Sequence, residues 1–550
     1  MDCNTTTTQK NTLPPSSLEG EQCLLINNKL ESNYLTLNNN NYQYCEADEL
    51  RKMSNATEST SITFSTATIE EAPEINNTLT YCLGNSRKLG LRKLESSFWS
   101  DATDFEEGTI PHSIVLALTI GIVNGVVAFL YYKCLFYLLQ LLWHDLPQKF
   151  VVGTSWNEHL YVLWIPIVGL SMSLGVGLSF RFLGDPKDLA YIVRCVHEQT
   201  YVPIAHALPM LIASQFSILG GASLGPEAPL VAICAAVGGF ISRHIFKTQQ
   251  RNSVRKHTLM GMASALSAFF GCPLGGGLFA LEVNNRLGME YYEHAVEVIF
   301  CGVVGLTVFR GLSGLPIGPI YDLQPTLPQS DAFTVVCGAL IGLLGASLAV
   351  CFSHFHWHIL KLFESYRLME AKKSVQRSLA GGLAIVTIGM ILPHTMFWGE
   401  MEFKTIVNLA PAKSLEHVFP TSGLIGFEMN SCASCLLVGL AKLVAISFSV
   451  AGGFRGGFIF PLFAAGAAFG RAFTFVCPSI LMLVSCLCFA CSINVAITRT
   501  ALSTPIILIY LCAQQNAIGP VLAASLVSLF ATYYTPFITS QVPRSLSFFW

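Results

Sequence analysis

Long runs of apolar residues recur along the chain from about residue 112 to the C-terminus. Many are about 20 residues long, which is the length that an α-helix needs to cross a bilayer. We count roughly ten to twelve such segments, several interrupted by Gly or Pro. Examples cover residues 114–142, 160–180, 259–281, 332–352 and 433–450. The pattern predicts an all-α polytopic membrane protein.

The first 108 residues have a different pattern. They are rich in Asn, Thr, Ser and Glu and contain no sustained apolar run. Such a segment cannot bury enough apolar surface to fold alone, so we expect residues 1–108 to be a disordered tail. Basic residues just before the first apolar run favour a cytoplasmic tail, because cytoplasmic loops carry an excess of Lys and Arg. These residues are Arg87, Lys88, Arg92 and Lys93.

Composition agrees with a membrane protein. Of 550 residues, 52% are hydrophobic and 12% are charged, whereas about 25% are charged in soluble proteins. The formal net charge is -2, and no basic stripe suggests a nucleic-acid partner. The polar residues form neither a nucleophile–base pair nor a three-ligand metal set. We therefore expect an integral, multi-pass membrane protein that is not an enzyme and has no cofactor or metal.

One stretch of the chain occurs twice. GGASLGPEAPLVAICAAVG (220–238) aligns without a gap with GGFRGGFIFPLFAAGAAFG (452–470), with nine of nineteen positions identical. In the same register, Pro273 aligns with Pro505. The repetition predicts two homologous halves.

A basic segment suggests where the halves divide. Residues 361–377 contain several Lys and Arg side chains between apolar segments. We expect a first membrane repeat at 109–360, a linker at 361–377, a second membrane repeat at 378–540 and a short C-terminal tail at 541–550.

Each copy of the repeat begins with a Gly-rich turn and continues into an apolar segment. Pro226, directly after Gly225, suits the first turn of a helix, where its missing N–H costs nothing. The first N–H groups of a helix are unpaired and carry the positive end of its dipole. Within a membrane, such an end must be buried in protein or face water. Two broken helices with inverted topology that meet near the midplane would therefore form an anion site.

Three stretches resemble signature regions of the CLC chloride channel and transporter family. They are GGASLGPEAPL (220–230), FFGCPLGGGLFALEV (269–283) and AKLVAISFSVAGGFRGGFIFPLFAAG (441–466). The resemblance implies a homodimer with one anion pathway per subunit, antiparallel halves and anions held mainly by backbone N–H groups. It implies that amides beyond Gly456 and Gly457 are the donors. The anion-binding residues implied in this way are Gly225, Gly456, Gly457, Phe458, Ile459 and the late tyrosine, Tyr533 or Tyr534.

The chain departs from the family pattern at its acidic positions. Leu224 stands where the family's gating glutamate directly precedes Gly-Pro, and Glu227 lies three residues later. Val283 stands where the exchangers have their inner proton-handling glutamate, and Glu282 is its acidic neighbour. Glu227 either gates the path as an anion mimic or only accepts N–H bonds at a helix start. Glu282 and Leu224 are further candidates at the gate or proton path.

Three other positions bear on the path. The family's serine motif has no clear counterpart in FLGDPKDL (182–189), which retains only Gly184 and Pro186. Arg455, in the second Gly-rich turn, either attracts anions or snorkels towards the interface. Lys442 either pairs with a buried carbonyl or adds positive potential to the path.

The sequence therefore predicts transmembrane transport of chloride or a similar small anion through a CLC-type pathway in the lipid bilayer. A passive channel is favoured, because Val283 removes one proton acceptor from its usual position. The alternatives are a proton-coupled exchanger, with protons as a second substrate, and a non-conducting membrane scaffold with the same fold.

Overall fold

The computed structural model describes residues 109–152, 158–285 and 294–541, without residues 322, 324, 325, 416, 422, 536 and 539. The chain divides into two units, Met1–Lys93 and Leu94–Trp550. All described residues belong to the second unit. The predicted tail at 1–108 lies outside the described residues, as does the C-terminal tail apart from Gln541.

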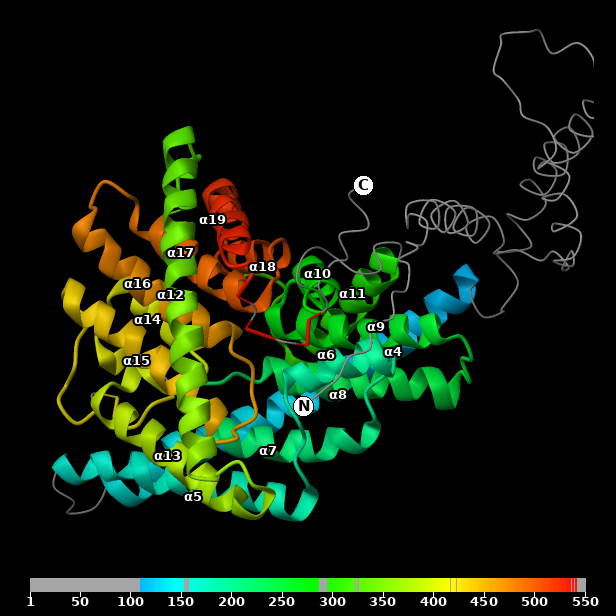
Figure 1. Ribbon diagram of the computed structural model, residues 1–550, viewed down its shortest axis with the longest axis horizontal. Coiled ribbons are helices and arrows are strands. Elements are labelled where there is room, and N and C mark those ends of the chain that lie inside the picture. Colours follow the sequence, from blue (N-terminus) through cyan, green and yellow to red (C-terminus); the bar gives the residue numbers. More distant parts are fainter. Residues whose placement is uncertain are drawn as a thin grey trace, which may run out of the picture. The chain divides into compact units, whose positions relative to one another are not determined.

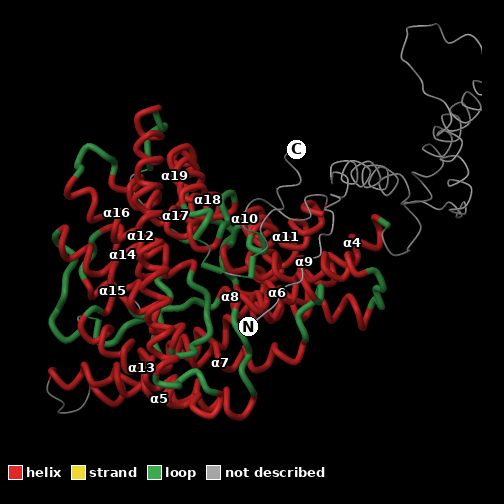
Figure 2. Tube along the Cα trace, viewed as in Figure 1, coloured by secondary structure: helices red, strands yellow, loops and turns green. Residues whose placement is uncertain are grey.

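The described residues form helices joined by loops and contain no β-sheet (Figures 1 and 2), which confirms the predicted all-α class. Their α-helices fall into two consecutive sets. The first set is α4 (Ile110–Gln140), α5 (Trp164–Leu183), α6 (Leu189–Glu198), α7 (Ala207–Leu219), α8 (Glu227–Phe240), α9 (Arg251–Phe270), α10 (Pro273–Glu282) and α11 (Ala295–Ser313). The second set is α12 (Ala332–Ser365), α13 (Ser374–Ile391), α14 (Glu400–Asn408), α15 (Cys432–Ala451), α16 (Ile459–Val476), α17 (Met482–Thr498), α18 (Ser503–Cys512) and α19 (Ile518–Ala531).

The helix boundaries follow the sequence repeat. Helices α8 and α16 begin at Glu227 and Ile459, which are aligned positions of the two copies. Helices α7 and α15 end at Leu219 and Ala451, which are also aligned. Between them, Gly225 and Gly457 form an antiparallel bridge. The predicted architecture of two inverted repeats with broken helices is thus confirmed.

The contacts of α12 bear on where the two repeats divide. Helix α12 continues to Ser365 and packs against α15, α17 and α19 of the second set. The basic segment 361–377 therefore connects α12 with α13 inside the second set. Because α12 packs within the second set, we propose that the repeats divide in the segment between α11 and α12.

Local sequence explains several helix starts. Asp188 and Asp331 precede α6 and α12, and their carboxylates accept hydrogen bonds from Tyr191 N at 2.9 Å and Thr334 N at 2.8 Å. Ser431 caps α15 in a reciprocal pair with Ser434. These side chains satisfy N–H groups that a helix start leaves unpaired.

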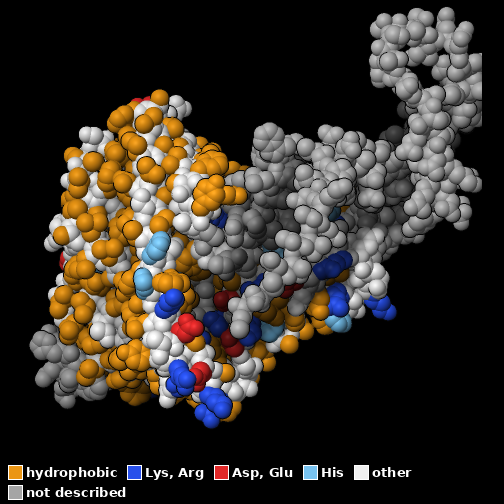
Figure 3. Space-filling model, in the orientation of Figure 1, with side chains coloured by type: hydrophobic (Ala, Val, Ile, Leu, Met, Phe, Trp, Pro, Cys, Tyr) orange, Lys and Arg blue, Asp and Glu red, His pale blue; other side chains and the backbone are white. Residues whose placement is uncertain are grey.

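Eight helical segments among the described residues are long and apolar enough to cross a membrane, and several shorter apolar helices accompany them. In Figure 3 the part of the surface over α12, α15 and α16 is predominantly hydrophobic. In the apolar part of α16, 72% of the residues are buried, against 44% in the span that contains α4. Helix α16 therefore lies mostly in the interior of the protein. The chain is an integral membrane protein that crosses the bilayer several times.

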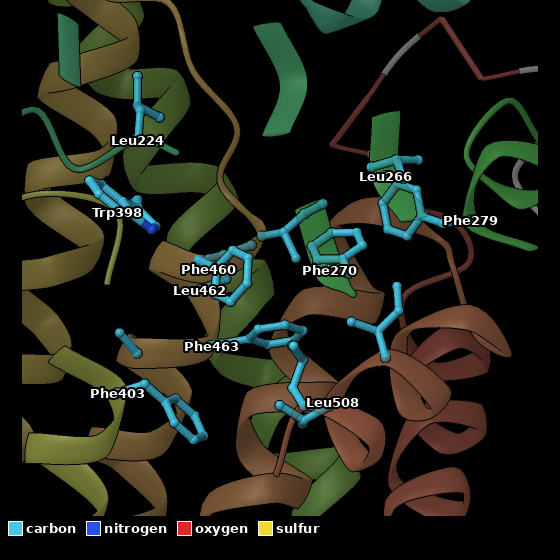
Figure 4. Packing of buried hydrophobic residues seen from close by; sticks show 14 of the residues in the cluster. Leu224, Leu266, Phe270, Phe279, Trp398, Phe403, Phe460, Leu462, Phe463 and Leu508 are labelled. Atoms are coloured by element: carbon cyan, nitrogen blue, oxygen red, sulfur yellow. The ribbon is translucent and has the colours of Figure 1, made fainter. Parts of the chain in front are cut away.

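Aromatic side chains form the core around the start of α16. Phe460 packs against Phe270 of α9, with 5.7 Å between ring centroids, and against Phe463 at 5.8 Å (Figure 4). Small residues on α16 allow α17 to pack closely against it. At Gly470, for example, an added Cβ would lie only 2.5 Å from Cα of Cys486 on α17. Such close backbone contact is typical of helix packing in membranes. The core therefore holds the start of α16 in a fixed position.

Candidate anion-binding site

The two glycine turns meet directly. Gly225 N donates to Gly457 O at 2.7 Å, and Gly457 N donates to Gly225 O at 2.7 Å. A Cβ at Gly456 would lie 2.5 Å from Cβ of Leu224, so the two turns approach too closely for a larger residue there. The N–H groups of Gly225 and Gly457 are thus both used by these two hydrogen bonds. The N–H donors for an anion must therefore come from the residues that follow.

Glu227 lies between the two helix starts. It is the first residue of α8, it is 1% exposed, and its Oε1 accepts a hydrogen bond of 3.1 Å from Ile459 N at the start of α16. Oε2 is buried and has no hydrogen-bond partner among the described residues. A Cβ added at Gly225 or at Gly457 would collide with this carboxylate. The acid of the first repeat thus reaches the positive end of the helix in the second.

Leu224 is fully buried and packs against Gly456. Its side chain fills the turn, whereas the acid three residues later enters the space between the helix starts. The described structure therefore brings Glu227, and not Leu224, to the amide of Ile459.

A small cavity of about 20 Å³ lies beside Glu227, and its walls include Gly457, Phe458 and Ile459. Its other lining residues are Leu189, Ala228, Val231, Met262, Leu266, Phe279, Val283 and Thr498. Among these described lining residues, Thr498 and Glu227 are the ones with polar side chains. Val283, which the family resemblance aligns with an acid of the exchangers, therefore lines this cavity with an apolar side chain.

Glu282 is engaged elsewhere. Its carboxylate accepts hydrogen bonds from Leu502 N at 3.0 Å, Ser503 N at 2.8 Å and Ser503 Oγ at 2.6 Å. These contacts satisfy the start of α18. The structure therefore shows Glu282 as a helix-start acceptor and does not bring it to the cavity beside Glu227.

The two predicted tyrosines lie apart from the cavities. Tyr534 is 91% exposed, and neither Tyr533 nor Tyr534 lines the cavity beside Glu227. Phe537 instead packs against Phe458, with 5.8 Å between ring centroids, and against His356 at 5.1 Å. Sequence reasoning missed Phe537 because it looked only for a tyrosine. Its nearness to the two tyrosines in ATYYTPF was the available signal.

A larger cavity of about 610 Å³ adjoins the same turn, and we call it the vestibule. Phe458, Leu189 and Ala228 line both cavities, so the vestibule lies next to the cavity beside Glu227. Its remaining walls come from the loop before α6, from α6, α7 and α8, from α12, α13 and α15, and from the segments that contain Arg455 and Phe537. The charged side chains in this lining are Asp185, Lys187, Asp188, Arg377 and Arg455.

Arg455 points into the vestibule and is paired there. Its Nη2 lies 2.5 Å from Oδ1 of Asp185, and its guanidinium stacks 5.0 Å from the Phe180 ring centroid. Burial raises the pKa of Asp185, but the Arg455 charge and hydrogen bond, with the contacts of Lys187, lower it more, so this pKa lies below its ordinary value. Asp185 is therefore ionised at neutral pH, and the pair persists there.

Lys442 holds backbone carbonyls. It is 1% exposed, and its Nζ donates to the carbonyls of Thr395 at 3.0 Å, Met396 at 3.1 Å and Phe397 at 2.8 Å. Phe397 N in turn donates to Gly221 O at 3.2 Å, in the first glycine turn. Of the two roles open to Lys442, pairing with buried carbonyls is the one that the structure shows.

We expect Lys442→Met to lower the free energy of unfolding by roughly 3 kcal/mol, because it leaves three buried carbonyls without a donor. Thermal unfolding of the detergent-purified protein measures the change. Lys372→Met is the matched control, because Lys372 is exposed and should unfold as the wild type does. Equal unfolding midpoints for the two variants would contradict the assigned role.

The fold is that of a polytopic membrane protein in which two broken helices meet at a buried carboxylate. The family model for the voltage gated chloride channel matches residues 187–533, and the chain belongs to this family.

Curated relatives agree with this family. The chain is 26% identical over 332 residues to a chloride/fluoride channel protein of Pseudomonas syringae pv. tomato, an alignment that covers 58% of this chain and 66% of that protein, just under two thirds of its length. It is 22% identical over 388 residues to the putative ion-transport protein YfeO of Escherichia coli, covering 70% of this chain and 84% of that protein.

Solved structures share the fold. A CLC-type fluoride/proton antiporter matches with a TM-score of 0.62 and 18% identity, covering 80% of this chain and 100% of that one. A slow cyanobacterial Cl⁻/H⁺ antiporter matches with a TM-score of 0.62 and 18% identity, covering 78% and 96%.

Proposed function

We propose that this protein passes small inorganic anions across the membrane, from the vestibule past Phe458 to the site that Glu227 now occupies. The observation that carries the proposal is the hydrogen bond from Ile459 N to the Glu227 carboxylate. A carboxylate at the start of a helix occupies the place that a free anion would take. An anion that replaced it would meet the same amide and the same helix dipole.

Glu227 then acts as a gate. Its ionised carboxylate blocks the site, and its protonation weakens the attraction to the helix start and lets the side chain leave. The alternative, a purely structural acceptor, fits the contacts less well. Oε2 is buried without a partner among the described residues, whereas buried polar groups with a structural role are normally hydrogen-bonded. Glu282, with both oxygens engaged, shows what a structural acid looks like in this chain.

A passive channel is favoured over a proton-coupled exchanger. Proton coupling needs a second proton acceptor besides Glu227, and apart from Glu227 and Thr498 the small cavity is lined by residues without polar side chains, among them Val283. Thr498 offers a hydroxyl, which does not store a proton. The exchanger remains the alternative, because solved structures with this fold include antiporters.

The substrate is a small anion such as chloride. Backbone amides recognise negative charge without demanding a particular shape, so fluoride, named with chloride in the Pseudomonas relative, is the second anion to test. The homodimer implied by the family resemblance belongs to the same proposal.

Reconstitution in liposomes tests this function. We expect a chloride gradient to drive anion flux without a fixed accompanying proton flux. Protein-free liposomes provide the background for both fluxes. A constant proton-to-anion ratio would establish the exchanger instead, and the absence of both fluxes from a correctly folded protein would favour the non-conducting scaffold.

A further inference from the structure

The vestibule contains two guanidinium groups that are close to the second glycine turn. Arg455 lies within that turn, and Arg377, from α13, lies over Gly453, where an added Cβ would be 3.3 Å from Nε of Arg377. Arg377 Nε donates to Ala451 O at 2.7 Å. Both side chains thus converge on one wall of the cavity, just before the residues that bridge to the first repeat.

These guanidinium groups have more donors than their hydrogen-bond partners use. A guanidinium has five N–H donors. Arg455 is 8% exposed and uses Nη2 for Asp185, while its buried Nε has no hydrogen-bond partner among the described residues. Because Nε is buried, a ligand in the vestibule would bind through the Nη groups, whose N–H donors Asp185 uses only in part.

Charge in the vestibule points to the same conclusion. Arg377, Arg455 and Lys187 line the cavity together with two acids, Asp185 and Asp188. The Asp188 carboxylate is occupied as the cap of α6, accepting from Tyr191 N. The lining therefore carries three cationic and two acidic side chains, an excess of positive charge that an additional anion would balance.

We propose that Arg455 and Arg377 form a second anion-binding site, in the vestibule, for a small oxyanion such as nitrate, formate or bicarbonate, and that the Asp185 carboxylate occupies part of this site when no oxyanion is bound. A guanidinium presents parallel N–H donors that match two oxygens of a planar oxyanion, which a halide does not offer. The group that Arg455 binds in this structure is a carboxylate, which has that geometry.

The cationic half of the site is fixed. Arg455 N donates to Ser217 Oγ at 2.8 Å, and its guanidinium lies on the Phe180 ring. The carboxylate half is less constrained. Asp185 follows Gly184, where an added Cβ would meet no atom within 4 Å, and the Asp185 side chain is 43% exposed. Asp185 also has a second cationic neighbour, since Lys187 Nζ lies 3.9 Å from its Oδ2. It can therefore leave Arg455 and keep a charged neighbour.

This site is separate from the one at Glu227. It uses side-chain charge, whereas the inner site uses backbone amides, and it lies in a cavity of about 610 Å³ that leaves room for an anion and its water. The role of this site in transport rests on the proposed function, because the vestibule would load anions for the inner site. The ability of the site to bind an oxyanion is independent of the proposed function.

Binding is measured on the full-length protein in detergent, from the rise of the thermal unfolding midpoint with increasing sodium nitrate or sodium formate at constant ionic strength, with sodium chloride as the reference. A ligand that binds only the folded state raises this midpoint. We expect both oxyanions to stabilise the wild type more than chloride does. We expect Asp185→Asn, which removes the competing carboxylate, to lower the apparent Kd for nitrate by about tenfold.

Arg455→Gln and Arg377→Gln should each abolish most of the difference between oxyanions and chloride. The matched control is Lys361→Gln, which removes one exposed positive charge near the vestibule and should respond as the wild type does. Unchanged nitrate responses in both arginine variants, or no gain of affinity in Asp185→Asn, would overturn the proposal. The gain expected from Asp185→Asn also guards against misfolding, which cannot raise affinity.

Chloride flux in liposomes separates this proposal from the proposed function. Chloride flux with no preference for oxyanion binding would refute the vestibule site and leave the transport function in place. Oxyanion binding that depends on Arg455, in a protein without anion flux, would support the site and contradict the transport function.

Discussion

Replacing Gly457 by Val is expected to abolish anion flux. A Cβ at this position would collide with the Glu227 carboxylate, and a β-branched side chain adds two more carbons to the collision. The bridge between Gly225 and Gly457, with its two hydrogen bonds of 2.7 Å, would have to open. The helix starts would then move apart, and the amide of Ile459 would lose its place in the pathway. Chloride flux from liposomes measures the loss.

Gly318→Val provides the control for this variant. Gly318 lies in the segment between α11 and α12, and an added Cβ there would meet no atom within 4 Å. The same substitution at this position should leave flux near the wild-type level. Gel filtration of both variants shows whether each is folded before reconstitution. Normal flux from a folded Gly457→Val protein would contradict an anion site between the two glycine turns.

The sequence alone was sufficient for the repeat and the position of its helix starts. The glycines and prolines that interrupt apolar segments mark the ends of helices in the local sequence. Because the stretch occurs twice without a gap, each helix end in one copy predicts the corresponding helix end in the other. Helices α8 and α16 begin at aligned residues for that reason. The location of Glu227 at a helix start was predictable in the same way, since it follows Gly225 and Pro226 directly.

Contacts between the two repeats could not be predicted from a single sequence. The partner of Glu227, Ile459 N, is 232 residues away, and Asp185 and Arg455 are 270 residues apart. Nothing local specifies which loop meets which turn. Lys442 illustrates the same limit, because its three acceptors lie at the end of the short 3₁₀ helix Pro393–Thr395 and just beyond it, where the sequence pattern does not define the backbone.

Individual side chains at the cavities were also hard to predict from the family resemblance. Phe537 packs against Phe458, where the resemblance suggested a tyrosine, and the exposed Tyr534 does not reach the vestibule. An aromatic ring can line a cavity with or without a hydroxyl, so a search for one residue type misses it. The apolar Val283 is a different case, because the sequence singled it out and the structure shows that it lines the cavity beside Glu227.

Replacing Glu227 by Gln is expected to make anion flux high and largely independent of pH. In the wild type, the ionised carboxylate binds at Ile459 N and competes with the permeating anion. Lowering the pH protonates a larger fraction of Glu227, so wild-type flux, measured from about pH 8 to about pH 4.5, should rise as the pH falls. Gln has nearly the same shape and no charge at any pH, so its attraction to the positive end of α16 is weak throughout.

Glu282→Gln is the matched control for Glu227→Gln, because it neutralises a second buried acid, which caps the start of α18. It should lower the free energy of unfolding by about 1 kcal/mol and leave the pH profile of flux unchanged. The two variants, measured in the same liposome assay, separate gating from helix capping. If Glu227→Gln keeps the wild-type pH profile and loses only stability, as Glu282→Gln should, then Glu227 is a structural acceptor and the gate lies elsewhere in the pathway.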